Sequence, residues 1–148
     1  MKTMKSVSYL LRAKGRDVWW VTPDISVYAA LQMMADKNVG ALLVFKVENL
    51  VGVFSERDYA RKVALKEKSS KYTLVKEAMT PIVASVLPEH TIEGCMELMT
   101  EKRVRHLPVL EGDRVVGVIS IGDVVKSLIS EQEFIIRDLE QYITGSVR

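Results

Sequence analysis

The chain of 148 residues has little cysteine and histidine and no long apolar run. Its single cysteine, Cys95, excludes an internal disulfide and favours a reducing, cytoplasmic setting. Two histidines, His90 and His106, are too few for a His/Cys metal cluster, so no metal site is predicted. No run approaches the roughly 20 apolar residues that span a bilayer, and there is no apolar signal core. Secretion and membrane insertion are therefore not expected.

The chain also lacks a strong charge and the common catalytic motifs. Lys and Arg number 21 against 19 Asp and Glu, and this balance gives no strong field to attract nucleic acid. The basic stretch 62–76 contains Glu67 and is followed directly by Glu77, as in a solvated linker. No glycine-rich phosphate loop is present, and neither Cys95 nor His90 has a partner motif for nucleophilic catalysis. We therefore expect a non-catalytic protein that does not bind nucleic acid.

An internal repeat is the main feature that the sequence does have. Shifted by 65 positions, the chain aligns with itself without a gap. Most identities in this register are apolar and predict a shared core, whereas the matched Gly, Ser and Asp have no packing reason to recur and point to a site. Each half is marginal alone and should pack against its twin. The informative pairs are Pro23/Pro88, Gly52/Gly117, Ser55/Ser120 and Asp58/Asp123.

Apolar spacing predicts the order β-α-β-β-α in each repeat. The fold class is therefore α/β (α+β), with two such repeats related by a pseudo-two-fold and flanked by helical segments. The expected elements of the first repeat are strand 18–21, helix 26–37, strands 41–46 and 50–54, and helix 56–66. Those of the second are strand 83–86, helix 91–102, strands 106–110 and 115–119, and a helix from Ile121 onward.

The predicted boundaries divide the chain into five segments. They are an N-terminal flank (1–17), the first repeat (18–66), a linker with a short helix near 75–79 (67–82), the second repeat (83–130) and a C-terminal helical extension (131–148). In the N-terminal flank, Val7, Leu10 and Leu11 fall on one helix face. Helices that outrun their own repeat often contact a partner chain. The stripe in the C-terminal extension consists of Val125, Leu128, Gln132, Ile135, Leu139 and Tyr142.

In each repeat a strand runs directly into a Ser-x-x-Asp segment that begins a helix. Free backbone N–H groups at a helix start favour anions, and an Asp at the third helical position offers two oxygens to a ribose diol. This pattern suits a nucleotide. The alternative is a capping box, in which the serine and the acid only cap the helix. The four candidate residues are Ser55, Asp58, Ser120 and Asp123.

The two repeats differ at the entry to their second strand. Arg105 and His106 stand in the second repeat where the first repeat has Gly40 and Ala41. An Arg next to a His offers charge-assisted donors to a phosphate, and Arg57 adds charge near a helix start. Small residues leave room for a flat base. A solvated basic surface and a tight strand contact are the alternative explanations.

These motifs resemble the cystathionine-β-synthase (CBS) domain, and the tandem resembles a Bateman module. The resemblance rests on the two Gly-h-x-Ser-x-x-Asp segments, in which h is a hydrophobic residue, on the strand 104–109 and on the Ala-Met-Thr-Pro segment 78–81. It implies that Asp58 and Asp123, with Ser55 and Ser120, hold the ribose of an adenosine ligand. It also implies a phosphate site and an adenine cleft between the repeats, in which only one of the adjacent Trp19 and Trp20 faces ligand. The phosphate candidates are Arg57, Arg105, His106 and Gly122, and the adenine candidates are Trp20, Thr22, Gly40, Ala41 and Val86.

The resemblance implies a regulatory module that senses AMP, ADP, ATP or NAD(H) and signals occupancy to a partner protein of unknown identity. No catalytic cofactor is expected. It also implies a homodimer, which the apolar stripes of both flanks could reinforce. Because Gly40 and Ala41 replace the basic pair, we expect two unequal sites. The alternative is a dimeric interaction scaffold whose ligand sites are vestigial.

Overall fold

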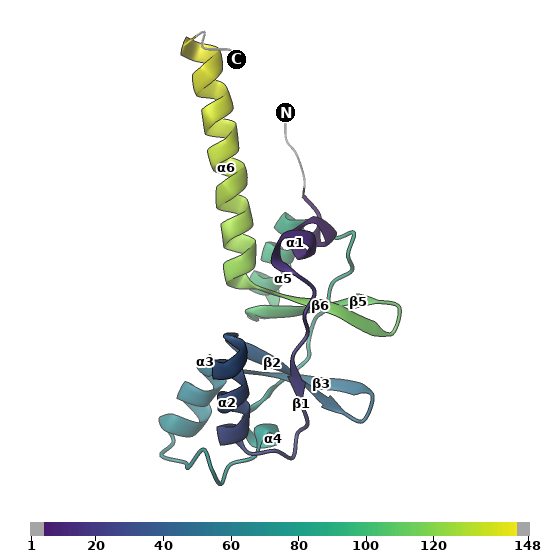
Figure 1. Ribbon diagram of the computed structural model, residues 1–148, viewed down its shortest axis with the longest axis vertical. Helices are drawn as coiled ribbons and strands as arrows, with labels where there is room; N and C mark the ends of the chain where they lie inside the picture. The colour runs from purple at the N-terminus through teal and green to yellow at the C-terminus, as the bar shows by residue number, and fades with distance from the viewer. Residues whose placement is uncertain (1–4, 145–148) are drawn as a thin grey trace. The chain divides into compact units, whose positions relative to one another are not determined.

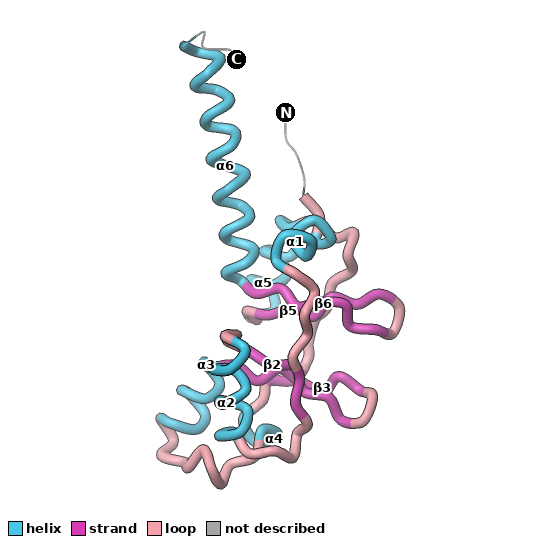
Figure 2. The backbone as a smooth tube through the Cα atoms, viewed as in Figure 1, coloured by secondary structure: helices cyan, strands magenta, loops and turns pink. Residues whose placement is uncertain are grey.

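The computed structural model describes residues 5–144, apart from the side chains of Tyr142 and Thr144, so the predicted stripe residue Tyr142 lies outside the described side chains. The chain divides into two units. The first repeat unit is Asp17–Val83, and the second repeat unit combines Met1–Arg16 with Ala84–Arg148. Each unit mixes helices with a small sheet, as Figure 2 shows, and the predicted mixed fold class is confirmed.

The first repeat unit is built on a four-stranded sheet in the order β1-β2-β3-β4, with β1 parallel to β2 and the other neighbours antiparallel (Figure 1). Helix α2 is capped by Ser26, whose Oγ accepts a hydrogen bond from the amide of Ala29 at 3.1 Å. The core includes Val27, Leu42 and Phe54. The elements are β1 (Trp20–Val21), α2 (Val27–Lys37), β2 (Ala41–Lys46), β3 (Asn49–Ser55), α3 (Glu56–Tyr59), the π-helix η1 (Ala60–Ala64), α4 (Val75–Ala78) and β4 (Thr80–Pro81).

The second repeat unit repeats this hairpin and its helices on a two-stranded sheet. Residue pairs across the hairpin keep the offset of 65: Ala41 faces Ser55 in β2–β3, and His106 faces Ser120 in β5–β6. The core includes Leu11, Leu107 and Ile119. The elements are α1 (Val7–Lys14), α5 (Ile92–Lys102), β5 (His106–Glu111), β6 (Arg114–Ser120) and α6 (Ile121–Thr144).

The predicted strand 83–86 is wrong, because only Val86 pairs, in an isolated parallel bridge with Val109. In the first repeat unit the amide of Leu43 donates to the carbonyl of Trp19 at 3.1 Å, which anchors β1. The residue equivalent to Leu43 is Pro108, which has no N–H to donate. One hydrogen bond of the ladder is therefore missing, and the segment is too weakly paired to form a strand.

The N-terminal helix α1 makes the same backbone contact in the second repeat unit that α4 makes in the first. The amide of Val7 donates to the carbonyl of His90, and that of Val75 to the carbonyl of Ile25, at 2.8 and 2.9 Å. The face predicted for α1 is confirmed, because Val7, Leu10 and Leu11 are all buried. The flank predicted at 1–17 therefore packs with the second repeat, whereas the helix that precedes the second repeat in sequence packs with the first.

Helix α6 is the longest element, with 24 residues. Its first turns pack on the core of the second repeat unit through Ile121, Val124 and Leu128. Its C-terminal half continues past α1 and α5 (Figure 1). Among the described residues, no helix is both long enough and apolar enough to cross a membrane.

Candidate functional site

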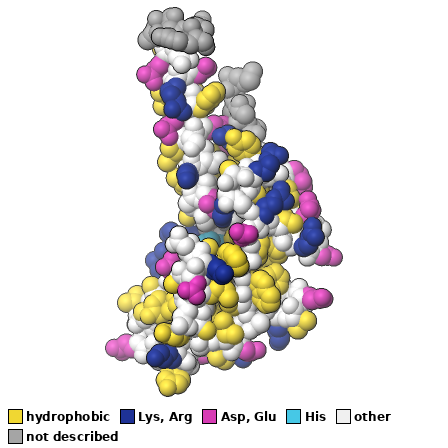
Figure 3. All heavy atoms as spheres, viewed as in Figure 1, with side chains coloured by type: hydrophobic (Ala, Val, Ile, Leu, Met, Phe, Trp, Pro, Cys, Tyr) yellow, Lys and Arg dark blue, Asp and Glu magenta, His cyan; other side chains and the backbone are white. Residues whose placement is uncertain are grey.

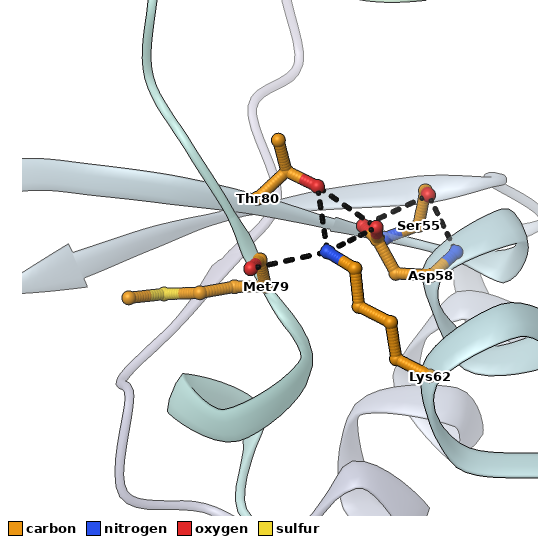
Figure 4. Close-up of polar contacts among 5 residues, drawn as sticks. All are labelled: Ser55, Asp58, Lys62, Met79 and Thr80. Atoms are coloured by element: carbon orange, nitrogen blue, oxygen red, sulfur yellow. Dashed lines mark hydrogen bonds and ion pairs between the residues drawn. The ribbon is translucent and has the colours of Figure 1, made fainter. Parts of the chain in front are cut away.

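The Ser-x-x-Asp segment of the first repeat unit lies where β3 ends and α3 begins, and it forms a complete capping box (Figure 4). The Oγ of Ser55 accepts a hydrogen bond from the amide of Asp58 at 3.1 Å. In return, Oδ2 of Asp58 accepts from the amide and the hydroxyl of Ser55, both at 3.0 Å. Both side chains are buried. The capping explanation therefore holds for this segment whether or not a ligand binds there.

The other carboxylate oxygen of Asp58 is held by two side chains from outside the motif (Figure 4). Oδ1 accepts a hydrogen bond from the hydroxyl of Thr80 at 2.8 Å and forms an ion pair with Nζ of Lys62 at 3.0 Å. Lys62 also donates to Thr80 at 3.1 Å. A carboxylate offers about four lone-pair positions, and all are used here. A ligand hydroxyl that binds Asp58 must displace one of these donors, such as the hydroxyl of Ser55 or Thr80 or the ammonium of Lys62.

The equivalent segment of the second repeat unit, between β6 and α6, has the same cap but a different third partner. The amide of Asp123 donates to Oγ of Ser120 at 3.1 Å, and the amide of Ser120 donates to Oδ2 of Asp123 at 2.8 Å. Lys14, from α1, donates to the same Oδ2 and to the carbonyl of Val118, both at 2.6 Å. Within the described part of the chain, no hydrogen bond reaches Oδ1 of Asp123. The donors described for this carboxylate therefore converge on Oδ2.

The carboxylate of Asp123 is more accessible than that of Asp58, with 25% against 11% of the side chain exposed. Partial burial by itself raises the pKa of Asp123, but the hydrogen bonds from Lys14 and Ser120 and the charge of Lys14 outweigh burial and lower it. Asp123 is therefore an anion at neutral pH and an acceptor for hydroxyl groups.

The residues that differ between the repeats lie directly beside these segments. The carbonyl of Gly40 accepts from the amide of Glu56 at 3.0 Å, and the carbonyl of Arg105 accepts from the amide of Ile121 at 2.8 Å. Ala41 and His106 face Ser55 and Ser120 across the hairpins. In the second repeat unit the Arg-His pair and the Ser-Asp segment therefore belong to one corner of the sheet. Arg105 is exposed and His106 is half-buried.

A hollow of about 410 Å³ opens beside Gly40, between the C-terminal half of α2 and the start of α3. Met34 and Val39 contribute apolar walls, and Asn38 and Glu56 contribute polar groups. A Cβ on Gly40 would lie 3.1 Å from Oε1 of Glu56, so any larger residue would narrow this end of the hollow. The space is of a size that a flat base could enter.

The remaining predicted site residues lie at different places in the two units. Trp20 is half-exposed on β1, and its ring stands edge-on to Phe45 at 5.8 Å, toward the hairpin end of the sheet. Trp19 instead packs on the core, so the two rings lie in different environments. Thr22, Arg57 and Gly122 are exposed, whereas Val86 is buried in the core of the second repeat unit.

Both Ser-Asp segments fall inside matches to a known family. The CBS domain family matches residues 14–65 and 75–130, which together form most of the chain. The chain belongs to the CBS-domain family. CBS-domain pairs are generally regulatory modules and bind adenosine-containing ligands. The predicted recognition of two CBS repeats is confirmed.

Relatives support this membership over nearly the whole chain. The mitochondrial CBS domain-containing protein CBSX3 of Arabidopsis thaliana is 38% identical over 149 residues, which cover 95% of this chain and 72% of the relative. A solved structure of a protein with CBS domains from Burkholderia ambifaria MC40-6 is 50% identical, with a TM-score of 0.81, and covers 86% of this chain and 96% of that one. The inosine-5'-monophosphate dehydrogenase of Methanocaldococcus jannaschii is 33% identical over 113 residues, which cover 75% of this chain and 22% of the enzyme.

Three residues that hold the aspartates were not among the sequence-predicted site residues. Lys62 follows Asp58 by four positions, a spacing that favours an ion pair on a helix, but its basic neighbours suggested a solvated linker. Thr80 belongs to the Ala-Met-Thr-Pro segment that carries the family resemblance. Lys14 lies 109 positions from Asp123, and no local pattern links the two.

Proposed function

We propose that this CBS-domain pair is a non-catalytic regulatory module that binds an adenine nucleotide, either AMP, ADP, ATP or NAD(H), and signals its occupancy to a partner protein. The ribose hydroxyls bind the carboxylates of Asp58 and Asp123, next to the hydroxyls of Ser55 and Ser120. Ligand shifts the module toward the arrangement that it binds better, and the partner responds to that shift. The Burkholderia ambifaria neighbour is named as a signal-transduction protein.

The observation that carries this proposal is the carboxylate of Asp123. It is charged, one-quarter exposed and fixed in position by donors that converge on Oδ2, and we propose that its Oδ1 accepts from a ligand hydroxyl. A preorganised acceptor loses little conformational entropy when it binds a ligand. Asp58 offers the same motif, but its four acceptor positions are occupied. We therefore propose that the second repeat binds nucleotide more tightly than the first.

The phosphate groups are proposed to bind beside the same carboxylate. Arg105 and His106 begin β5 at the corner of the sheet that also holds Ser120. A guanidinium next to an imidazole donates charge-assisted hydrogen bonds to phosphate oxygens. The first repeat has Gly40 and Ala41 there and cannot supply these donors. It offers the hollow beside Gly40 instead, which is proposed to take the base.

Isothermal titration of the full chain with AMP, ADP, ATP and NADH tests the proposal. Asp123→Asn should raise the dissociation constant of the nucleotide that binds by at least about tenfold, because the substitution removes a charged hydrogen-bond acceptor. The matched control is Asp113→Asn, a loss of the same charge in the exposed β5–β6 turn. Arg105→Ala should weaken the binding of AMP more than the binding of adenosine. Equal losses of affinity for the two ligands would rule out a phosphate role for Arg105.

A dimeric interaction scaffold with vestigial ligand sites is the second candidate function. The closed network around Asp58 favours it, because that carboxylate is satisfied without any ligand. If none of the four nucleotides gives a saturable heat or raises the melting temperature, sensing is wrong and the scaffold is the better explanation. A melting shift that is lost in Asp123→Asn but kept in Asp113→Asn would exclude the scaffold.

The cellular setting of this function stays a prediction. The single cysteine, Cys95, is fully buried in a unit that needs no disulfide, which suits the reducing, cytoplasmic compartment expected from the sequence. The Arabidopsis relative is named as mitochondrial. The expected homodimer also stays a prediction, because a cyanobacterial neighbour is named as hexameric.

A further inference from the structure

Helix α6 carries an apolar seam that no described element of its own unit covers. The spacing along this seam alternates between four and three residues, which is the 3.5-residue period of a coiled coil. The large apolar side chains of the seam are between 39% and 80% exposed. Figure 3 shows hydrophobic side chains along α6 among charged ones. The seam consists of Val125, Ile129, Gln132, Ile136, Leu139 and Ile143.

The choice of residues along the seam is that of a two-stranded parallel coiled coil. From Val125 onward, Ile129, Ile136 and Ile143 occupy the a positions, and Val125, Gln132 and Leu139 occupy the d positions. β-Branched residues at a together with leucine at d favour two parallel strands. Beyond Leu128, where the helix leaves its own core, the face opposite the seam is polar apart from Phe134. The pattern therefore specifies one narrow contact face along the helix.

Gln132 indicates what the other strand is. It occupies the d position at the middle of the seam, where an unpaired amide would be costly to bury. A primary amide both donates and accepts, so two Gln132 side chains from in-register helices satisfy one another. A second copy of the same helix supplies that amide at the matching depth. A polar residue at one layer of a seam also fixes the register.

We propose that α6 pairs in parallel and in register with α6 of a second copy of this chain, through the seam Val125–Ile129–Gln132–Ile136–Leu139–Ile143. The helix is 24 residues long, or about 36 Å at the usual rise, and its C-terminal half extends past the other elements of its unit. The pairing buries the exposed isoleucines and needs no nucleotide. It is thus independent of the ribose and phosphate roles proposed above.

Sedimentation equilibrium of the full chain tests the pairing. The double variant Ile129→Asn/Ile136→Asn should raise the dissociation constant of the assembly at least about a hundredfold, because it removes two apolar layers from the seam. The two side chains are 53% and 54% exposed in the single chain, so the melting temperature of the monomeric body should not change. The control is Phe134→Asn on the opposite face, 65% exposed, which should leave the assembly intact.

Gln132→Leu should act in the opposite direction and lower the dissociation constant, because it replaces a polar layer in the seam by an apolar one. The pairing is wrong if the wild-type chain is monomeric at every concentration, or if the Ile129/Ile136 variant sediments like the wild type. It is also wrong if Phe134→Asn weakens the assembly as much as the seam variant does.

Cysteine cross-linking tests the parallel register. Gln132→Cys should form a disulfide-linked dimer under mild oxidation, whereas Phe134→Cys should not. The native thiol does not compete, because Cys95 is fully buried and burial raises its pKa to about 11. Failure of Gln132→Cys to cross-link, in a variant that still assembles, would overturn the parallel register.

Discussion

The two Ser-Asp segments share a motif and a cap but differ in what completes them. Around Asp58 the third partners come from neighbouring segments of the same repeat, Lys62 and Thr80, and they use every acceptor position. Around Asp123 the third partner is Lys14, from the N-terminal helix, and it donates to Oδ2, the oxygen that the cap already uses. The repeated motif therefore fixes the start of the helix, whereas residues outside the motif decide which oxygens of the carboxylate are already occupied.

The largest expected difference between the repeats concerns the glycine before each segment. A Cβ at Gly52 would lie 2.9 Å from the backbone carbonyl of Thr80, so β4 would have to shift. A Cβ at Gly117 would lie 2.8 and 2.9 Å from the two Cδ atoms of Leu11, a buried side chain that can adjust more easily than the backbone of β4. We expect Gly52→Ala to lower the free energy of unfolding by about 3 kcal/mol and Gly117→Ala by about 1 kcal/mol. Urea unfolding measures both, and equal losses would mean that Leu11 is as rigid as the backbone of β4.

Removing the two carboxylates should separate the repeats further. Asp58→Ala breaks a buried network of four interactions, and we expect a loss of about 2 kcal/mol in the free energy of unfolding. Asp123→Ala removes a more exposed carboxylate with fewer partners, and we expect about 1 kcal/mol. Thermal and urea unfolding of both variants, without nucleotide, check the order. A larger loss for Asp123→Ala would contradict the view that its site is the more open one.

Acid should weaken the link between Lys14 and Asp123. Because the folded state lowers the pKa of Asp123 below its ordinary value of 3.8, the stability that the pair contributes is present above that value and is lost as the pH falls through the folded pKa. The wild type should therefore exceed Lys14→Met in stability at pH 7, by less than about 1 kcal/mol, and the difference should shrink as the pH falls below 3.8.

The control for the Lys14 variant is Lys76→Met, whose ion pair with Asp24 is largely exposed. Urea unfolding at a series of pH values should give little difference between this variant and the wild type at any pH. A gap between Lys14→Met and the wild type that stays constant across the acid range would exclude Asp123 as the titrating partner.

The two hairpin turns should respond to substitution with opposite signs. Val47 has a φ of 60° where the second repeat has Gly112 at 66°. A β-branched residue is strained at positive φ, whereas asparagine tolerates it. Val47→Asn should therefore raise the free energy of unfolding by about 0.5 kcal/mol, and Gly112→Val should lower it by about 1 kcal/mol. A stability loss in Val47→Asn would show that the exposed valine makes a contact that outweighs the strain.

Local patterns predicted the parts of the fold that depend on local physics. The helices and both hairpins follow from apolar spacing, and the structure confirms their bounds within a residue or two, although residues 60–64 of the helix expected at 56–66 form a π-helix. The strand expected at 83–86 failed because pairing depends on the partner strand, where Pro108 lacks the donor. The pattern of Val7, Leu10 and Leu11 predicted one apolar helix face, but the expectation that this face reinforces a homodimer is wrong, because it is buried in the core of the second repeat unit.

The candidate site was predictable to the same extent. The 65-residue offset located Ser55, Asp58, Ser120 and Asp123, and the structure places each pair at a strand end and helix start. Lys14 was not predictable, because its contact with Asp123 spans 109 positions and depends on how the chain returns. The hydrogen bond from Thr80 to Asp58 was not predictable either, because Thr80 lies on β4, which pairs with β3 only in the folded sheet.

Helix α1 is at the N-terminus of the chain but belongs to the second repeat unit, which affects both folding during synthesis and the outcome of truncation. The first repeat unit is one continuous stretch of chain, so all of it is synthesised before the second repeat. Helix α1 is synthesised earlier still, yet it must wait for α5, β5 and β6 before Leu11 has a core to join. A fragment that starts at residue 83 would therefore contain the whole second repeat of the sequence and still lack Leu11 and Lys14. Trimming the first 16 residues should damage the half of the molecule that is synthesised last.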